Sequence, residues 1–262
     1  HVLEKTPARV PLKNTAHTLF GLVEELTLRP SSLNRYLTCP RQFLYQHLLR
    51  TPQPKKTALV YGQCVHKAVE KSFRRFLKED KLPRIEYFES IFQEELHFQG
   101  VDPSVFQSCI QKFEHAKSWY MEQLKVGVIK PIELEKRLIK KMEEGLIFQG
   151  KFDKVEMITG TQEIKVIDYK TGDPEKHIRA LHNITDIFSP ECDDYLRQLI
   201  AYKMLYEAGY SRKKVKIGEL QFLDPAKKDI KKYGLQKGKF IHYPIGLNSD
   251  MVKNFEQLVL QT

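Results

Sequence analysis

The stretch "VIDYKTG", residues 166–172, carries an acid and a lysine one residue apart at the end of an apolar run. Side chains alternate along a β-strand, so Asp168 and Lys170 point to the same face of this strand, which Gly172 ends. A carboxylate and an ammonium on the inner face of an apolar strand indicate a functional site. The alternative is an edge strand whose solvent face carries a salt bridge, and the rest of the chain decides between the two.

Upstream of this strand, the pattern predicts a mainly helical half. Residues 1–30 are mixed and punctuated by prolines, and we interpret them as an N-terminal arm or linker. Ser31 or Ser32 is the expected N-cap of the first helix after the arm. Apolar residues recur at helical spacing in four segments, which are 30–49 with an interruption at Pro40, 61–80, 85–98 and 103–125.

The character of the sequence changes at Pro131, after which short alternating runs up to Gly172 predict a meander of antiparallel strands. A long polar loop follows, and then four segments are expected as helix, strand, strand and helix, at 192–210, 215–223, around 238–245 and 249–260. The prediction is an α/β (α+β) fold in which helices flank a central mixed sheet. It is one domain over 31–262, with a helical elaboration at about 31–125 and the catalytic sheet and helices at about 131–262.

The charge of the chain suggests a polyanionic partner. Its 262 residues include 43 Lys and Arg against 33 Asp and Glu, a formal net charge of +10. Three basic runs, 71–78, 211–216 and 226–232, either form a phosphate-binding surface or lie on solvated helix and loop faces. No run of 18 apolar residues occurs, so we expect no membrane span. The chain opens with His1 and not Met, and we expect it to be a piece of a longer protein.

Two acids can converge beside the lysine of the opening stretch. "GKFDKVE" places Asp153 fifteen residues before Asp168, so the two carboxylates can face each other across a hairpin. Two carboxylates next to a lysine suit a hard divalent cation such as Mg²⁺. Lys170 can then orient an attacking water and neutralise charge that develops in the transition state of phosphoryl transfer. The alternative pairs the acids with Lys151 and Lys154.

Three further residues are candidates. Gln198 and Tyr202 are four residues apart on a predicted helix and share one face, where they could hold a base or a phosphodiester. The alternative is that Tyr202 packs in the core while Gln198 is solvated. His66 lies on the helix predicted at 61–80, and a lone helical histidine is more often structural than a ligand.

These pieces, in this order, resemble the RecB-like branch of the PD-(D/E)xK nuclease superfamily, which also includes the AddB nuclease domain and the CRISPR-associated exonucleases. The resemblance covers about residues 31 to 223 and rests on "SSLNRYLTCPRQFLY", "YGQCVH", "GKFDKVE", "DYKTG" and "QLIAY". Lys154 and Glu156 depart from the residues common in the family, and neither departure removes a metal ligand. The fold that the resemblance implies is restriction-endonuclease-like.

The resemblance also implies roles for individual residues. His66, Asp153, Asp168 and the backbone carbonyl of Tyr169 would bind Mg²⁺ or Mn²⁺, and Asp153, Asp168 and Lys170 would be catalytic. Gln198 and Tyr202 would contact the substrate, and Glu135 could sit near the site on the preceding strand.

The activity implied is hydrolysis of DNA phosphodiester bonds to leave 5′-phosphates. The substrate would be single-stranded ends, fed by a helicase on the same full-length chain or on a partner subunit during DNA repair or recombination. The alternative is a catalytically silent nucleic-acid-binding or scaffolding module of the same fold. An intact site favours the enzyme, whereas a histidine that points into the core would favour the scaffold.

The four cysteines do not form a metal-binding pattern. None of them forms a C-x-x-C pair, which argues against a zinc module. Free thiols in a chain with no signal peptide indicate a reducing cytoplasm. Some RecB-like nucleases hold a four-cysteine iron–sulfur cluster, and Cys39 occupies something like its first position. No cysteine follows Tyr202, so we expect no cluster and interpret Cys39 as a small buried hydrophobe. The four are Cys39, Cys64, Cys109 and Cys192.

Overall fold

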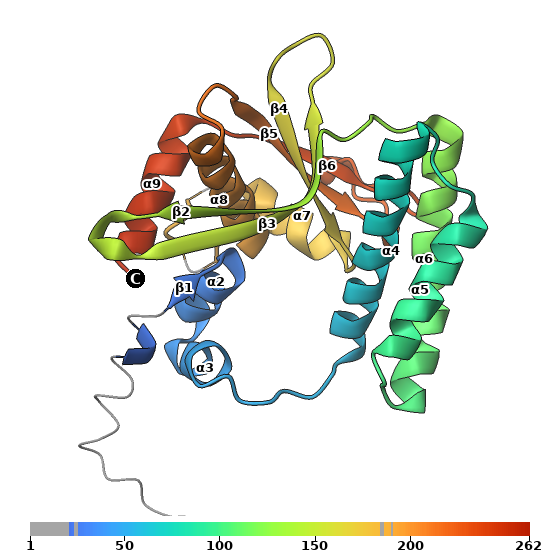
Figure 1. Cartoon of the computed structure of the whole chain (residues 1–262), viewed down its shortest axis with the longest axis horizontal. Coiled ribbons are helices and arrows are strands. Elements are labelled where there is room, and N and C mark those ends of the chain that lie inside the picture. Colours follow the sequence, from blue (N-terminus) through green and yellow to red (C-terminus); the bar gives the residue numbers. More distant parts are fainter. Residues whose placement is uncertain (1–20, 24–25, 184–185, 190) are drawn as a thin grey trace, which may run out of the picture.

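The computed structural model describes residues 21–23, 26–183, 186–189 and 191–262, so most of the arm expected at 1–30 lies outside the described residues. Within them, a six-stranded mixed sheet lies between two groups of helices (Figure 1). The strands are β1 (Thr27–Leu28), β2 (Glu133–Lys141), β3 (Ile147–Met157), β4 (Ile164–Lys170), β5 (Val215–Phe222) and β6 (His242–Gly246). The predicted α/β fold with a central mixed sheet is therefore confirmed.

The strand pairing confirms the predicted meander and places the opening stretch at the centre of the sheet. Strands β2, β3 and β4 pair antiparallel in sequence order, and β5 pairs parallel with β4 and antiparallel with β6. Strand β4 thus has a partner on both edges, and its residues 166–169 are buried. The edge-strand interpretation of "VIDYKTG" is therefore wrong.

The helices cover the two faces of the sheet and enclose a core on each. Helices α4 (Thr57–Glu79), α5 (Ile85–Phe98) and α6 (Pro103–Val126) pack on one face, where Ile167 and Tyr169 join their core. Helices α2 (Pro30–Thr38), α8 (Asp194–Gly209) and α9 (Ser249–Leu260) pack on the other, with Val166 in that core. The remaining helical segments are α3 (Pro40–Phe43), α7 (Pro174–Asn183), a π-helical turn at Leu44–Leu48 and 3₁₀ turns at Glu143–Gly145 and Lys231–Tyr233.

Three local expectations need correction. Helix α2 begins at Pro30 with Arg29 as its N-cap, because proline suits the first helical position. Ser32 is instead the third helical residue, and its hydroxyl accepts from the Arg29 N–H at 2.8 Å. The loop expected to be wholly polar contains α7, whose Ile178 and Leu181 turn into the core at helical spacing. Cys39 is half-buried and not buried, whereas the other three free cysteines are buried.

Strand β3 changes partner along one of its edges, and this shapes the site. On that edge β1 pairs with residues 147 and 148, and β4 pairs with residues 154 to 157. No strand in the described part of the chain pairs with residues 149–153 on this edge. Figure 1 shows the long β2–β3 arm bending away from β4 there. Asp153 lies where the two strands separate.

No described helix is both long enough and apolar enough to cross a bilayer.

Close packing of α8 on β3 depends on Gly150. A Cβ at this position would lie 2.6 Å from Leu205 Cδ1 and 3.4 Å from Tyr202 Cε1. The first of these distances is shorter than real Cβ contacts, so a Cβ at residue 150 would force the buried Leu205 side chain or α8 itself to shift. The approach of α8 to β3 brings the Tyr202 hydroxyl within 3.1 Å of Asp168 Oδ1 on β4.

We therefore expect Gly150→Ala to lower the free energy of unfolding by about 1–3 kcal/mol, the usual cost of overpacking a core. Urea unfolding followed by circular dichroism would measure it. Gly246→Ala is the matched control, since a Cβ at residue 246 would contact nothing within 4 Å. Equal stability of the two variants would contradict the role assigned to Gly150.

Candidate active site

Asp153 is fixed at the point where β3 and β4 separate. Its side chain is 11% exposed, and its Oδ2 accepts a hydrogen bond from the backbone N–H of Tyr169 at 2.8 Å. The carboxylate thus satisfies a buried N–H at the place where the ladder opens. Its Oδ1 lies 3.3 Å from His66 Nδ1. Burial alone would raise the pKa of Asp153, but His66 and the hydrogen bonds outweigh burial and lower it.

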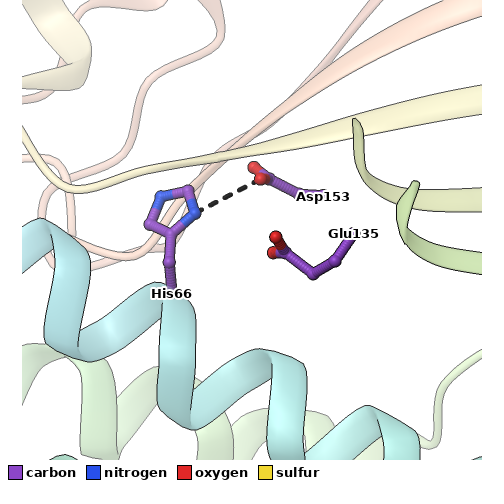
Figure 2. A group of neighbouring side chains, drawn as sticks. All are labelled: His66, Glu135 and Asp153. Atoms are coloured by element: carbon purple, nitrogen blue, oxygen red, sulfur yellow. Dashed lines mark ion pairs between the residues drawn. The ribbon is translucent and has the colours of Figure 1, made fainter. Parts of the chain in front are cut away.

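His66 reaches this carboxylate from α4. One turn earlier, a Cβ at Gly62 would lie 3.0 Å from Thr171 Oγ1, so the glycine lets α4 come close to the end of β4. The imidazole packs edge-on against Tyr169 and points at Asp153, and not into the core (Figure 2). Burial acts to lower the pKa of His66, but the Asp153 carboxylate prevails and raises it to about 9.

Asp168 is held by α8 on the other side of the sheet. The residue is 2% exposed, and its Oδ1 accepts from Gln198 Nε2 at 2.9 Å and from the Tyr202 hydroxyl at 3.1 Å. Gln198 is therefore not simply solvated, and both helical residues reach the strand. Burial raises the pKa of Asp168, Asp153 raises it further, and Lys170 opposes the rise. Contact of Gln198 and Tyr202 with substrate stays a prediction.

Lys170 lies within a set of three contacts. Its ammonium forms an ion pair with Asp168 Oδ2, donates to Gln198 Oε1 at 2.7 Å, and sits 4.1 Å from the centroid of the Tyr195 ring. Burial would lower the pKa of Lys170, but Asp168 raises it above its ordinary value. Tyr195 was missed in the sequence, although it precedes Gln198 by three residues and so shares its helical face.

Glu135 is the second residue whose importance the sequence understated. It lies in β2, and the pairs on either side of it place it opposite Asp153. Its φ of 51° is left-handed, which is uncommon for glutamate and is a form of local strain often found at functional sites. Burial and then Asp153 raise its pKa, while an ion pair with Lys151 opposes them. The sequence could have indicated Glu135, because Glu135 and Asp153 each lie nine residues from position 144, at the turn of the hairpin.

These side chains fit a divalent cation. One ligand atom each from His66, Glu135 and Asp153 lie within 4.8 Å of one another (Figure 2). Carboxylate oxygens suit Mg²⁺ and Mn²⁺, and Mn²⁺ also accepts an imidazole nitrogen. Asp168 Oδ2 is buried and accepts no hydrogen bond, facing only the Lys170 ion pair, so it keeps capacity for a ligand. Ligation by Asp168 and by the Tyr169 carbonyl stays a prediction.

A family comparison agrees with this geometry. The model of the PD-(D/E)XK nuclease superfamily matches residues 27–261. The chain belongs to this superfamily. The match begins at the first residue of β1 and ends one residue after α9, so it includes both sets of helices and every strand described.

A solved structure shows the same fold at low identity. The crystal structure of a protein named "Putative exonuclease", from Eubacterium rectale, is 13% identical to this superfamily member, with a TM-score of 0.50 over 97% of this chain and 84% of that one. The crystal structure of SSO0001 is 15% identical over 95% and 87% of the two chains, but its TM-score of 0.38 is too low to carry an argument. A search of the curated proteins finds no match.

The His66–Asp153 pair predicts an unusual titration in metal-free protein. In chelator, the imidazole of His66 should titrate near pH 9, and Asp153→Asn should lower its pKa to or below the ordinary value of about 6.5. The pKa of His66 is higher in the folded than in the unfolded protein. The stabilisation that the charged His66–Asp153 pair gives is therefore fully present below about pH 6.5, and it is lost as the pH rises through 9.

Histidine NMR signals followed against pH in EDTA would test this, with His66→Gln used to identify the resonance among the nine histidines. A midpoint near 6.5 in both wild type and Asp153→Asn would show that the ion pair does not form.

Proposed function

We propose that the chain is a divalent-metal-dependent nuclease that hydrolyses DNA phosphodiester bonds and leaves 5′-phosphates. The observation that carries the proposal is the convergence of His66, Glu135 and Asp153 beside the buried Asp168–Lys170 pair. Because His66 points at Asp153 and not into the core, the arrangement favours an enzyme over a silent module. The neighbour named as an exonuclease supports attack from strand ends.

The site residues divide the chemistry among them. Bound Mg²⁺ or Mn²⁺ supplies Lewis-acid activation of the phosphodiester and of a nucleophilic water. Lys170 stays protonated at neutral pH because its pKa is raised, so it acts as a cation that orients water and neutralises developing negative charge, and not as a general base. Asp168 holds the ammonium, and Gln198 bridges the two by donating to the carboxylate and accepting from the lysine.

The biological setting that we propose follows from the resemblance to RecB-like nucleases. The domain would act as an exonuclease on single-stranded ends in the cytoplasm. It would be coupled to a helicase on the same full-length chain or on a partner subunit, and would serve DNA repair or recombination.

A degradation assay with plasmid and oligonucleotide DNA in Mg²⁺, Mn²⁺ or EDTA tests the activity. We expect Asp168→Ala and Lys170→Ala each to lower the cleavage rate about a hundredfold or more. Calorimetric titration with Mn²⁺ should separate their roles, because an ammonium does not ligate a cation. Lys170→Ala should keep its metal affinity, whereas Asp168→Ala should lose much of it.

Glu135→Gln tests the added ligand, and we expect it to weaken Mn²⁺ binding about 10–100-fold. Glu163→Gln is the matched control, because Glu163 lies half-exposed and, among the described residues, its one ion pair is with Lys216. Undiminished cleavage in EDTA would refute metal dependence, and wild-type Mn²⁺ affinity in Glu135→Gln would remove Glu135 from the ligand set.

A further inference from the structure

A basic groove opens beside the catalytic lysine. It is a cavity of about 590 Å³ between α2, the β2–β3 arm and the start of α8, and Lys170 lies in its wall. The other basic side chains that line it are Arg29, Arg35, Arg137 and Lys151. Asp194 is the one carboxylate among its lining residues, and it lies 3.6 Å from Arg197. We call this cavity the arginine groove.

None of the three arginines of the groove forms an ion pair with the described residues, although the Asp194 carboxylate interacts with Arg35 at longer range. Among the residues that the structure describes, no carboxylate lies within 4.0 Å of Arg29, Arg35 or Arg137, although other basic residues of the chain form many such pairs. Neutral amides hold two of them. Gln149, with its amide oxygen turned toward Arg29, accepts from Nε at 2.6 Å and from Nη2 at 2.8 Å, and Arg35 donates to Gln42 Oε1 at 2.8 Å. Amide partners orient a guanidinium and leave its charge available to an anion.

The aromatic side chains of the groove are not available to stack on a base. The Tyr195 ring stacks on His177 with centroids 4.1 Å apart, and Lys170 Nζ lies 4.1 Å from the same centroid. Two groups at that distance cannot share one face, so both faces of the ring are covered. Tyr202 is 4% exposed and its hydroxyl donates to Asp168. The groove therefore offers cations to phosphates and no free aromatic face to bases.

A second cavity lies on the other side of the site and has a different character. It has a volume of about 480 Å³ and is lined by His66, Glu135 and Glu70 among others, and it shares Lys151 with the arginine groove. Its two carboxylates are paired with lysines, Glu70 with Lys67 and Glu135 with Lys151, so it offers no surplus of cations to phosphate. His66 and Glu135 of the metal-ligand group line this cavity, and the unpaired arginines lie across the site from it.

We propose that the arginine groove binds the sugar–phosphate backbone of a single nucleic-acid strand on one side of the scissile bond, through Arg29, Arg35 and Arg137 and without reading bases. This proposal rests on the proposed nuclease function. It specifies, in addition, where the uncleaved part of the strand lies. Binding of this kind is independent of sequence and falls steeply with salt, because each neutralised phosphate releases counterions.

The test measures fluorescence anisotropy of labelled single-stranded oligothymidine and of a mixed-sequence oligonucleotide against salt concentration. Ca²⁺ replaces Mg²⁺, because the same kinds of oxygen ligand bind it. Arg137→Gln and the double variant Arg35→Gln/Arg137→Gln should each bind both oligonucleotides more weakly by the same factor. The slope of log affinity against log salt should fall by about 0.7 for each phosphate that the variant no longer neutralises. Arg29→Gln is a third variant. Because Arg29 also contacts Gln149, circular dichroism would be used to check that this variant folds.

Arg84→Gln is the matched control. Arg84 is exposed, precedes α5 on the opposite face of the sheet and lies in none of the three basic runs, so this variant should keep the wild-type slope. If the wild type binds and cleaves DNA but the groove variants keep the wild-type slope, the proposal that the groove binds the strand is wrong. A weakening that differs between the two oligonucleotides would overturn binding without base contact. A wild type that neither binds nor cleaves would instead overturn the proposed function.

Discussion

The separation of β3 from β4 at Asp153 is the constraint on which the site depends. An antiparallel ladder normally satisfies the backbone N–H groups of both strands, so opening it inside a protein leaves a buried donor without a partner. Here the Asp153 side chain accepts from the Tyr169 N–H and replaces the missing strand partner. The same hydrogen bond fixes one oxygen of the carboxylate and leaves the other beside His66. The opening of the sheet therefore also sets the position of the candidate metal-ligand group.

The two helical layers bring the remaining groups to this opening from opposite faces. Helix α4 supplies His66, and α8 supplies Gln198 and Tyr202. Each helix comes this close where a glycine removes a side chain, at Gly62 on the helix itself and at Gly150 on β3. The two cores then hold the helices in place, since β4 contributes buried side chains to both. A site assembled from both faces requires a central strand that is covered by helices on both faces.

The charges of the site are maintained against the cost of burial. Desolvation disfavours every charged form here, yet Lys170 stays cationic because it lies against the Asp168 carboxylate. Isolated burial of such a pair is often neutral or unfavourable for stability. The pair is better understood as a preorganised charge next to the candidate metal ligands than as a source of stability. In our proposal the arginine groove adds three further cations, which have no carboxylate partner among the described residues and would bind an anion from outside the chain.

The sequence by itself determined the order and type of most elements and the residues of the local motifs. Helical spacing, alternation and turn residues are properties of neighbours in the chain, which is why α5 was predicted to the residue and the meander was predicted correctly. The acid and lysine of "VIDYKTG" could be placed on one face for the same reason. Helix α7 was missed because its apolar residues are few, although Ile178 and Leu181 are buried.

Only the tertiary structure decided which distant residues meet. Glu135 joins His66 and Asp153 because β2 and β3 pair in one register, and Tyr195 covers Lys170 because α8 sits close to the sheet. The arginines of the groove come from the N-cap and the last turn of α2 and from β2, and none belongs to the three basic runs that the sequence made conspicuous. Those contacts depend on strand register and on the approach of helices to the sheet. Both are set by packing of the whole core, and no local pattern in the sequence encodes them.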